Sequence, residues 1–231
     1  MQEVVVVNEE ILSLLNEALY FYHNRRDLPD YEKVFEPKVQ SRREEYISEH
    51  YLKTIQNIGT GHSGFPTSVL AWTYKLVKSI KKSEDEENFQ YSGYPVDIES
   101  ANKWAELDSK LATALSVRHN ALANLYPPGG YISWHNNANA TSFNLIFTWS
   151  ETGDGWFDYT DPNGKRVRCH DKANQWVCRY GMFGSYTDTK HPLVYHAAAT
   201  DCWRMTLSYI FDKSETSAAV QEFIIDELTT P

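Results

Sequence analysis

The stretch from Ser142 to Trp149, which reads SFNLIFTW, decides the fold class of the chain. Large apolar side chains occupy every second position, at 143, 145, 147 and 149. A period of two is the pattern of a β-strand, whose side chains point alternately to the two faces of a sheet. The stretch therefore predicts a strand.

Similar short runs follow it along the second half of the chain. They cover residues 155–159, 165–169, 175–183, 192–196 and 202–211. The segment Asp161-Pro162-Asn163-Gly164, between the first two runs, has the composition of a hairpin turn. Many short strands joined by turns predict a sandwich, a barrel or a jelly roll.

The first half of the chain has the pattern of helices. Apolar residues recur at helical spacing from Ile11 to Phe21, and further candidate helices cover 41–57, about 66–82 and about 100–122. We therefore expect an α+β protein in which a helical region at 1–124 buttresses a β-core at 125–213, with a terminal helix or tail at 214–231. No Pro/Gly/Ser-rich linker separates these parts, so we expect one structural unit.

The composition excludes several classes of protein. The net charge of −9 over 231 residues argues against broad binding to duplex nucleic acid or to an anionic membrane. The chain has no run of 18 apolar residues, and its first residues, MQEVVVVNEE, lack the features of a signal peptide. Three cysteines without CxxC spacing predict reduced thiols and a cytoplasmic protein.

One group of polar residues on predicted strands has the pattern of a site. In GGYISWHNN, residues 129–137, the i, i+2 spacing of a strand places Tyr131, His135 and Asn137 on one face. Farther along, His196 ends an apolar run, and Arg204 and Thr206 share a face of the next strand. An arginine on an inner face is costly to bury unless it meets an anion.

These features occur in the order YPPGGYISWHNN, an aromatic strand, GMFGSY and YHAAATDCWRMTLSYIF. In that order, over roughly residues 125–211, the chain resembles the Fe(II)/2-oxoglutarate dioxygenase superfamily, in its prolyl-hydroxylase-like branch with a double-stranded β-helix core. The resemblance implies Fe(II) and 2-oxoglutarate as cofactors. It implies His135 and His196 as metal ligands, and Arg204 with Thr206 as the clamp for the distal carboxylate of 2-oxoglutarate. Tyr131 and Asn144 are further candidates for the same carboxylate.

The chain departs from the family's HxD motif at Asn137, which stands where the family has an aspartate. A neutral amide is a weaker ligand for a hard cation than a carboxylate. Three interpretations stay open: Asn137 binds the metal weakly, it leaves a coordination position to water or halide, or the site has lost its metal. His135, Asn137 and His196 are the candidate catalytic and metal-ligating residues.

The function implied by the resemblance is the oxidation of an organic substrate by O2 and 2-oxoglutarate, with hydroxylation as the default outcome. The substrate would be a small molecule, a nucleotide or a peptide side chain. The competing hypotheses are a non-catalytic binding protein on the same scaffold, and a structural or carbohydrate-binding jelly roll. For Arg204 alone, the competing hypothesis is a structural ion pair, for instance with Asp201 or Asp188.

Overall fold

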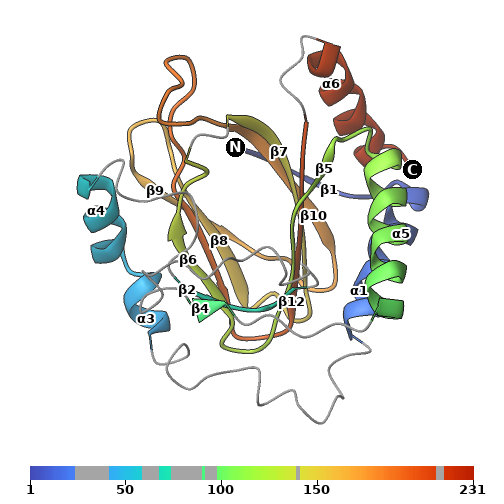
Figure 1. Cartoon of the computed structure of the whole chain (residues 1–231), viewed down its shortest axis with the longest axis horizontal. Coiled ribbons are helices and arrows are strands. Elements are labelled where there is room, and N and C mark those ends of the chain that lie inside the picture. The colour runs from blue at the N-terminus through green and yellow to red at the C-terminus, as the bar shows by residue number, and fades with distance from the viewer. Residues whose placement is uncertain (24–41, 59–67, 74–89, 92–97, 139–140, 212–215) are drawn as a thin grey trace.

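The computed structural model describes residues 1–23, 42–58, 68–73, 90–91, 98–138, 141–211 and 216–231. Within these residues, two six-stranded sheets lie between two groups of helices (Figure 1). The sheets are antiparallel except for one short parallel pair, β2 with β4. The chain is therefore a mixed protein of helices and antiparallel sheet.

The first sheet has the strand order β1-β10-β7-β12-β5-β3. Its strands are β1 (Gln2–Val5), β10 (Trp176–Phe183), β7 (Ser142–Ser150), β12 (Arg204–Ile210), β5 (His119–Tyr126) and β3 (Trp72–Thr73). The second sheet has the order β4-β2-β6-β11-β8-β9. Its strands are β4 (Gln90–Tyr91), β2 (Ser68–Leu70), β6 (Tyr131–His135), β11 (His196–Thr200), β8 (Gly155–Thr160) and β9 (Arg166–His170).

The helices cover the outer faces of the two sheets. Helices α1 (Glu9–His23), α5 (Ile98–Ala114) and α6 (Thr216–Thr229) lie on the side of the first sheet. Helices α3 (Arg43–Tyr46) and α4 (Glu49–Ile58) lie on the side of the second sheet (Figure 1). The inner faces of both sheets are thereby directed toward each other.

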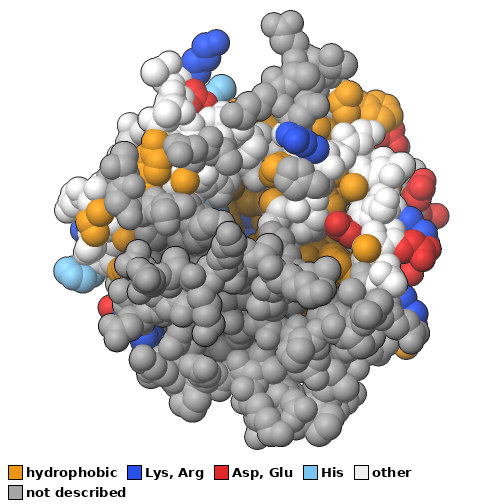
Figure 2. All heavy atoms as spheres, in the orientation of Figure 1, with side chains coloured by type: hydrophobic (Ala, Val, Ile, Leu, Met, Phe, Trp, Pro, Cys, Tyr) orange, Lys and Arg blue, Asp and Glu red, His pale blue; other side chains and the backbone are white. Residues whose placement is uncertain are grey.

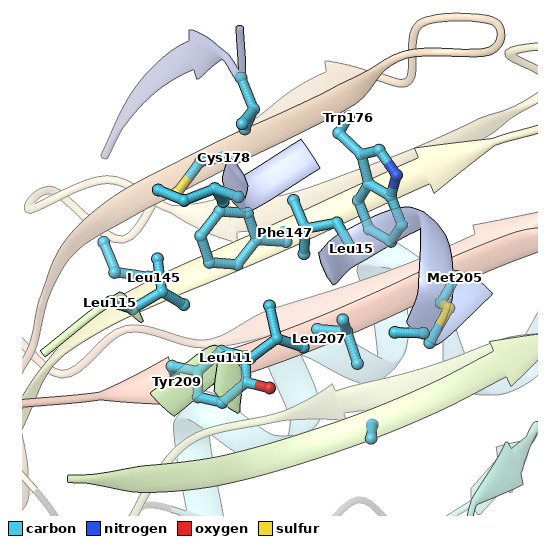
Figure 3. Close-up of a cluster of buried hydrophobic side chains, with 14 of the residues drawn as sticks. Leu15, Leu111, Leu115, Leu145, Phe147, Trp176, Cys178, Met205, Leu207 and Tyr209 are labelled. Carbon is cyan, nitrogen blue, oxygen red and sulfur yellow. The ribbon is translucent and has the colours of Figure 1, made fainter. Parts of the chain in front are cut away.

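The largest core fills the space between the first sheet and its helices. Leu15 of α1 and Leu111 of α5 are fully buried against Phe147, Leu207 and Tyr209 of the sheet (Figure 3). The odd-numbered residues of β7 and β12 form this apolar outer face, as the alternation predicts. Arg204, Thr206 and the even-numbered residues of β7 consequently point inward.

A smaller core covers the outer face of the second sheet. Trp134 packs with Leu52 and Ile55 of α4, and its indole donates a hydrogen bond of 3.0 Å to the Ile47 carbonyl. Trp134 therefore points to the face opposite the neighbouring His135. The candidate helix at 41–57 is interrupted at Ile47 and Ser48, because the Ser48 hydroxyl accepts a hydrogen bond of 3.0 Å from the backbone of Tyr51 and so starts α4 anew.

Two predicted helices are partly wrong. Residues 68–70 and 72–73 are strands, although 66–82 was predicted to be helical, and residues 74–82 lie outside the described part. The helix predicted at about 100–122 ends at Ala114, and His119 begins β5. There Ser116 has φ +50°, and its amide and that of Val117 bond to the Thr113 and Ala112 carbonyls at 3.0 Å each. This is a Schellman C-cap, with serine where glycine is usual.

Several strand boundaries also differ from the prediction. The run at 192–196 is not a strand except for its last residue, His196, which begins β11. The N-terminal residues Gln2–Val5 form β1, which pairs with β10 and extends the first sheet. The hairpin at Asp161–Gly164, between β8 and β9, is confirmed.

No helix among the described residues is long and apolar enough to cross a membrane. On the face seen in Figure 2, charged side chains of the described residues gather along the right-hand edge, over α1 and α5. Some of them form exposed pairs, such as Glu106 with Lys110 at 2.9 Å. The charge on this edge therefore belongs to solvated helix surface.

Candidate metal centre and anion site

Two buried histidines face each other across neighbouring strands. His135 ends β6, His196 begins β11, and the two residues are directly opposed in the antiparallel pair. Their ring centroids are 4.1 Å apart, and the two residues are only 7% and 9% exposed. The two histidines predicted to share a metal are thus brought together.

Both imidazoles are oriented by main-chain carbonyls two residues earlier in the chain. His135 Nδ1 lies 2.8 Å from the Ser133 carbonyl oxygen, and His196 Nδ1 lies 3.3 Å from that of Val194. An imidazole that donates from Nδ1 carries its lone pair on Nε2, which is the tautomer that binds a metal through that atom. The pair is therefore preset for metal binding through the two Nε2 atoms.

His196 lies in apolar surroundings. Its ring stacks on Phe183 at 5.0 Å and lies 6.0 Å from Phe157, measured between centroids. Burial lowers the pKa of His196 to about 4, against the smaller raising effect of its hydrogen bond to Val194. At neutral pH the ring is uncharged, as a metal ligand must be.

Asn137 follows β6 in a short segment whose two neighbouring residues, Asn136 and Ala138, are held by hydrogen bonds. The side chain of its neighbour Asn136 accepts a hydrogen bond of 2.7 Å from the Ala138 amide and donates one of 3.0 Å to the Tyr186 hydroxyl. The amide of Tyr186 in turn donates to the Ala138 carbonyl at 3.0 Å. Asn137 itself is partly exposed, and its side chain has no hydrogen-bond partner among the described residues. The segment that carries it is thus fixed.

Arg204 lies on the inner face of the first sheet, as predicted, and is 1% exposed. Its Nε donates to Asp171 Oδ2 at 2.7 Å, its Nη1 to Thr206 Oγ1 at 2.6 Å, and its Nη2 to Thr148 Oγ1 at 3.4 Å. The structural ion pair therefore exists, with Asp171 as partner. The two aspartates considered from the sequence bind elsewhere: Asp201 to Arg43 and Asp188 to His191.

Two residues of β5 belong to this site and were missed in the sequence. Tyr126 lies opposite Arg204, whose guanidinium carbon is 5.5 Å from the centre of the tyrosine ring. Asn124 lies opposite Thr206 and is fully buried. The only signal for them was the alternation in Asn124-Leu125-Tyr126, which was hidden because the preceding residues had been assigned to a helix.

The side chain of Asn124 has an unmet hydrogen-bonding group. Its Nδ2 donates to the Tyr126 hydroxyl at 3.2 Å, and its Oδ1 is buried without a partner among the described residues. An orphaned buried oxygen costs about 1–3 kcal/mol. Because a tyrosine hydroxyl can also donate, turning the amide over would satisfy Oδ1 and direct the N–H groups to the unpartnered side. Asn124 can thus serve a bound anion.

The histidine pair and the arginine site face the same interior. Tyr126, which lies beside Arg204, belongs to the buried cluster that also contains Phe157 and Phe183, the two rings against His196. The cluster lies between the inner faces of the sheets and also includes Ile132, Ile146 and Val194. A metal-bound ligand and its distal carboxylate would therefore share one largely apolar environment.

The structure separates two other candidates from this site. Tyr131 packs with Tyr46 and Ile47 of α3, on the outer face of the second sheet, so the prediction that it shares a face with His135 is wrong. The cause is a β-bulge, since the pairing of β6 with β11 shifts by one residue between His135 and Ile132.

Asn144 lies on the predicted inner face, but at the wrong end of its strand. Its amide donates to Ser142 at 3.0 Å and 3.2 Å. In the pairing of β12 with β7, Arg204 lies opposite Ser150 and Ile210 opposite Asn144. Six residues of strand span roughly 20 Å, so Asn144 does not reach the carboxylate site.

The donor groups fit a divalent transition metal and a carboxylate. Two neutral imidazoles suit iron, copper, nickel or zinc. The described residues contain no group of three or more His, Cys, Asp or Glu able to hold a metal ion. Within the described ranges, the candidate third ligand is the neutral Asn137 amide, two residues after His135, so a bound anion would be the source of negative charge. Arg204, Thr206 and Asn124 provide the donors for such an anion.

No protein-family model and no curated protein sequence matches this chain. Among solved structures, it is similar to a Pseudomonas putida prolyl-4-hydroxylase, with 14% identity, over 52% of this chain and 68% of that one, at a TM-score of 0.29. It is also similar to OsALKBH1, with 13% identity over 72% and 94% of the two chains and a TM-score of 0.29. A third is a full-length Neurospora crassa protein in complex with alpha-KG and thymine, with 12% identity, 96% and 92% coverage and a TM-score of 0.28. TM-scores this low do not establish a shared fold.

Proposed function

We propose that this chain is an Fe(II)- and 2-oxoglutarate-dependent oxygenase that hydroxylates an organic substrate. The observation that carries the proposal is the opposed pair His135 and His196, with both Nδ1 atoms turned to main-chain carbonyls. In the proposed site these two residues, with Asn137, hold the metal.

The strand order supports a double-stranded β-helix as the scaffold. From β5 to β12, successive strands alternate between the sheets except at β8 to β9, a hairpin within one sheet, giving the orders β10-β7-β12-β5 and β6-β11-β8-β9. Eight strands in two facing antiparallel sheets are the arrangement of jelly rolls. In this scaffold the helical region at 1–124 and the tail at 214–231 would support the core at 125–213.

The chain's own residues would bind and orient the reactants. Arg204 and Thr206, with Asn124 and Tyr126 beside them, would hold the distal carboxylate of 2-oxoglutarate. The bound metal would supply the activation of O2, with 2-oxoglutarate converted to succinate and CO2 as the substrate gains an oxygen atom. Phe157 and Phe183 would exclude water from the side of His196.

A second candidate is a non-catalytic binding protein on the same scaffold. Two observations favour it: Asn137 offers no negative charge, and Arg204 already has an anionic partner in Asp171. The orphaned Oδ1 of Asn124 favours a ligand beside Arg204 in either case. The two candidates differ in whether the histidine pair binds a metal.

The test is an anaerobic titration with Fe(II) and 2-oxoglutarate, followed by the visible charge-transfer band of the chelate. We expect a band in the wild type, a weaker one in Arg204→Ala and a stronger one in Asn137→Asp. Arg118→Ala, which removes an exposed arginine, is the matched control and should leave the band unchanged. Formation of succinate is then measured in air.

The outcomes separate the two candidates. A band that appears only in Asn137→Asp would show a site that has lost its metal, which would favour the binding protein. If none of these variants gave a band, the oxygenase proposal would be refuted.

A further inference from the structure

We propose that Asp171 is a positioning residue of the carboxylate site, which fixes the Arg204 guanidinium so that its two Nη groups are presented to the distal carboxylate. The inference rests on the proposed function and assigns a role to a residue outside both the histidine pair and the arginine motif. Asp171 follows β9, and its side chain is 1% exposed.

The geometry of the pair sets the direction of the guanidinium. Asp171 Oδ2 accepts from the Nε of Arg204 at 2.7 Å, so the carboxylate occupies the side edge of the guanidinium and not its Nη1–Nη2 edge. The two Nη atoms carry four N–H groups, of which Thr206 accepts one from Nη1 at 2.6 Å and Thr148 accepts one from Nη2 at 3.4 Å. One N–H group on each Nη atom therefore remains for the two oxygens of a carboxylate.

Asp171 is itself held by a second buried arginine. Arg179, on the inner face of β10, donates from Nη1 to Asp171 Oδ1 at 3.2 Å and from Nη2 to the His170 carbonyl at 3.1 Å. Its Nε is paired with Glu3 of β1 at 2.9 Å. Each oxygen of the Asp171 carboxylate thus binds a different guanidinium group. The carboxylate cannot rotate without breaking an ion pair.

The charges of this network explain why Asp171 does not simply neutralise Arg204. The three buried side chains Arg179, Asp171 and Arg204 carry two positive charges and one negative charge. Glu3, with 31% of its side chain accessible, pairs with Arg179 and also with Lys172, whose Nζ lies 3.6 Å from Glu3 Oε1. The five side chains therefore carry three positive and two negative charges, and the remaining positive charge favours an anion that binds at the buried Arg204, where it is poorly screened.

The backbone provides the room that the ion pair needs. A Cβ on Gly155 would lie 2.5 Å from Asp171 Oδ2 and 3.3 Å from Arg204 Cδ. A side chain at this position would therefore displace the pair. Gly155→Ala moves the Asp171 carboxylate while keeping its charge, so it offers a second and independent perturbation.

The test compares two ligands that chelate a metal through the same 2-oxo acid group. 2-Oxoglutarate has a distal carboxylate, and 2-oxopentanoate has a methyl group in its place. Fe(II)-loaded protein is titrated anaerobically with each, and the dissociation constant is read from the chelate band. We expect Asp171→Asn to raise the dissociation constant of 2-oxoglutarate roughly tenfold or more, which is the scale of outer-shell effects. The dissociation constant of 2-oxopentanoate should rise less than twofold. Gly155→Ala should show the same split.

The split distinguishes positioning from general structural support. If both variants weaken the two ligands equally, or if 2-oxoglutarate binds the variants as tightly as the wild type, the positioning role is refuted while the proposed function stands. If the wild type binds neither 2-oxo acid, the proposed function fails and this inference falls with it. Circular dichroism spectra confirm that each variant is folded, and Gly155→Ala decides the question if Asp171→Asn does not fold.

Discussion

The substitution Gly184→Ala should destabilise the protein strongly, because a methyl group at this position collides with backbone. Gly184 follows β10 and forms a parallel bridge with Leu193. A Cβ there would lie 2.5 Å from the Pro192 carbonyl oxygen and still closer to that of His191. Neither atom is the end of a flexible side chain, so the two segments must move apart.

The cost follows from what this movement breaks. Overpacking of this kind costs about 1–3 kcal/mol. Separation of the segments also weakens the hydrogen bond from the Gly184 amide to the Pro192 carbonyl, which is 3.0 Å long in the wild type. The loss of one such hydrogen bond costs about 1 kcal/mol of stability. We expect a loss of about 2–4 kcal/mol, which lowers the melting temperature by roughly 5–15 °C in a chain of this size.

The assay is thermal unfolding followed by circular dichroism, with Gly164→Ala as the control. Gly164 has φ +76°, but a Cβ there would meet only Gln56 Nε2 at 3.6 Å. The control therefore suffers backbone strain of about 1–2 kcal/mol without a collision. Because Phe183 stacks on His196, Gly184→Ala should also weaken Fe(II) binding. A fall in melting temperature no larger than that of the control, with unchanged Fe(II) binding, would refute the reasoning.

Three further predictions concern stability. Leu111→Ala, in the core of Figure 3, should cost about 2–5 kcal/mol in urea denaturation, and a loss below 1 kcal/mol would mean that α5 does not pack as described. Ala138→Gly should stabilise the protein by up to about 1 kcal/mol in the same assay, because Ala138 has φ +49°, and a loss of stability would contradict this. The Lys190 amide and the His191 ring hold the pKa of the Asp188 carboxyl well below its usual range. The stability that the Asp188 carboxylate contributes should thus be present above about pH 4 and lost as the pH falls below that value. The melting temperatures of the wild type and Asp188→Asn should therefore converge in acid and diverge near neutrality.

The parts of the fold that could be predicted are those in which one face of an element is apolar. The alternation in β7 and β12 predicted both strands and the inward direction of Arg204. The periodicity of α1 predicted a helix that packs on this sheet. In each case a single apolar face sets the spacing of the hydrophobic residues, so the sequence alone indicates the type of element.

Other elements are determined by contacts with distant residues. The run at 68–73, SVLAWT, has four consecutive apolar residues and is compatible with a helix or a strand, and its strands form by pairing with β6 and β5. The helix end at Ser116 lacks the expected glycine. Asp171 could not be found at all, because a loop aspartate in the sequence gives no sign of the two arginines, 8 and 33 residues away, that bind it.

The candidate site shows why alternation can identify the right residues and still misplace one of them. His135 and Tyr131 are separated by four positions, and a regular strand would direct both to the same face. The bulge in β6 inserts one residue into this interval, so Tyr131 and Trp134 both face the helices while Ile132 and His135 face the interior. Every residue of β6 is buried, so neither face is exposed to solvent and no polar–apolar alternation in the sequence marks the shift. The bulge also gives the pairing that sets His135 opposite His196, so the irregularity that defeated the prediction for Tyr131 is part of what forms the histidine pair.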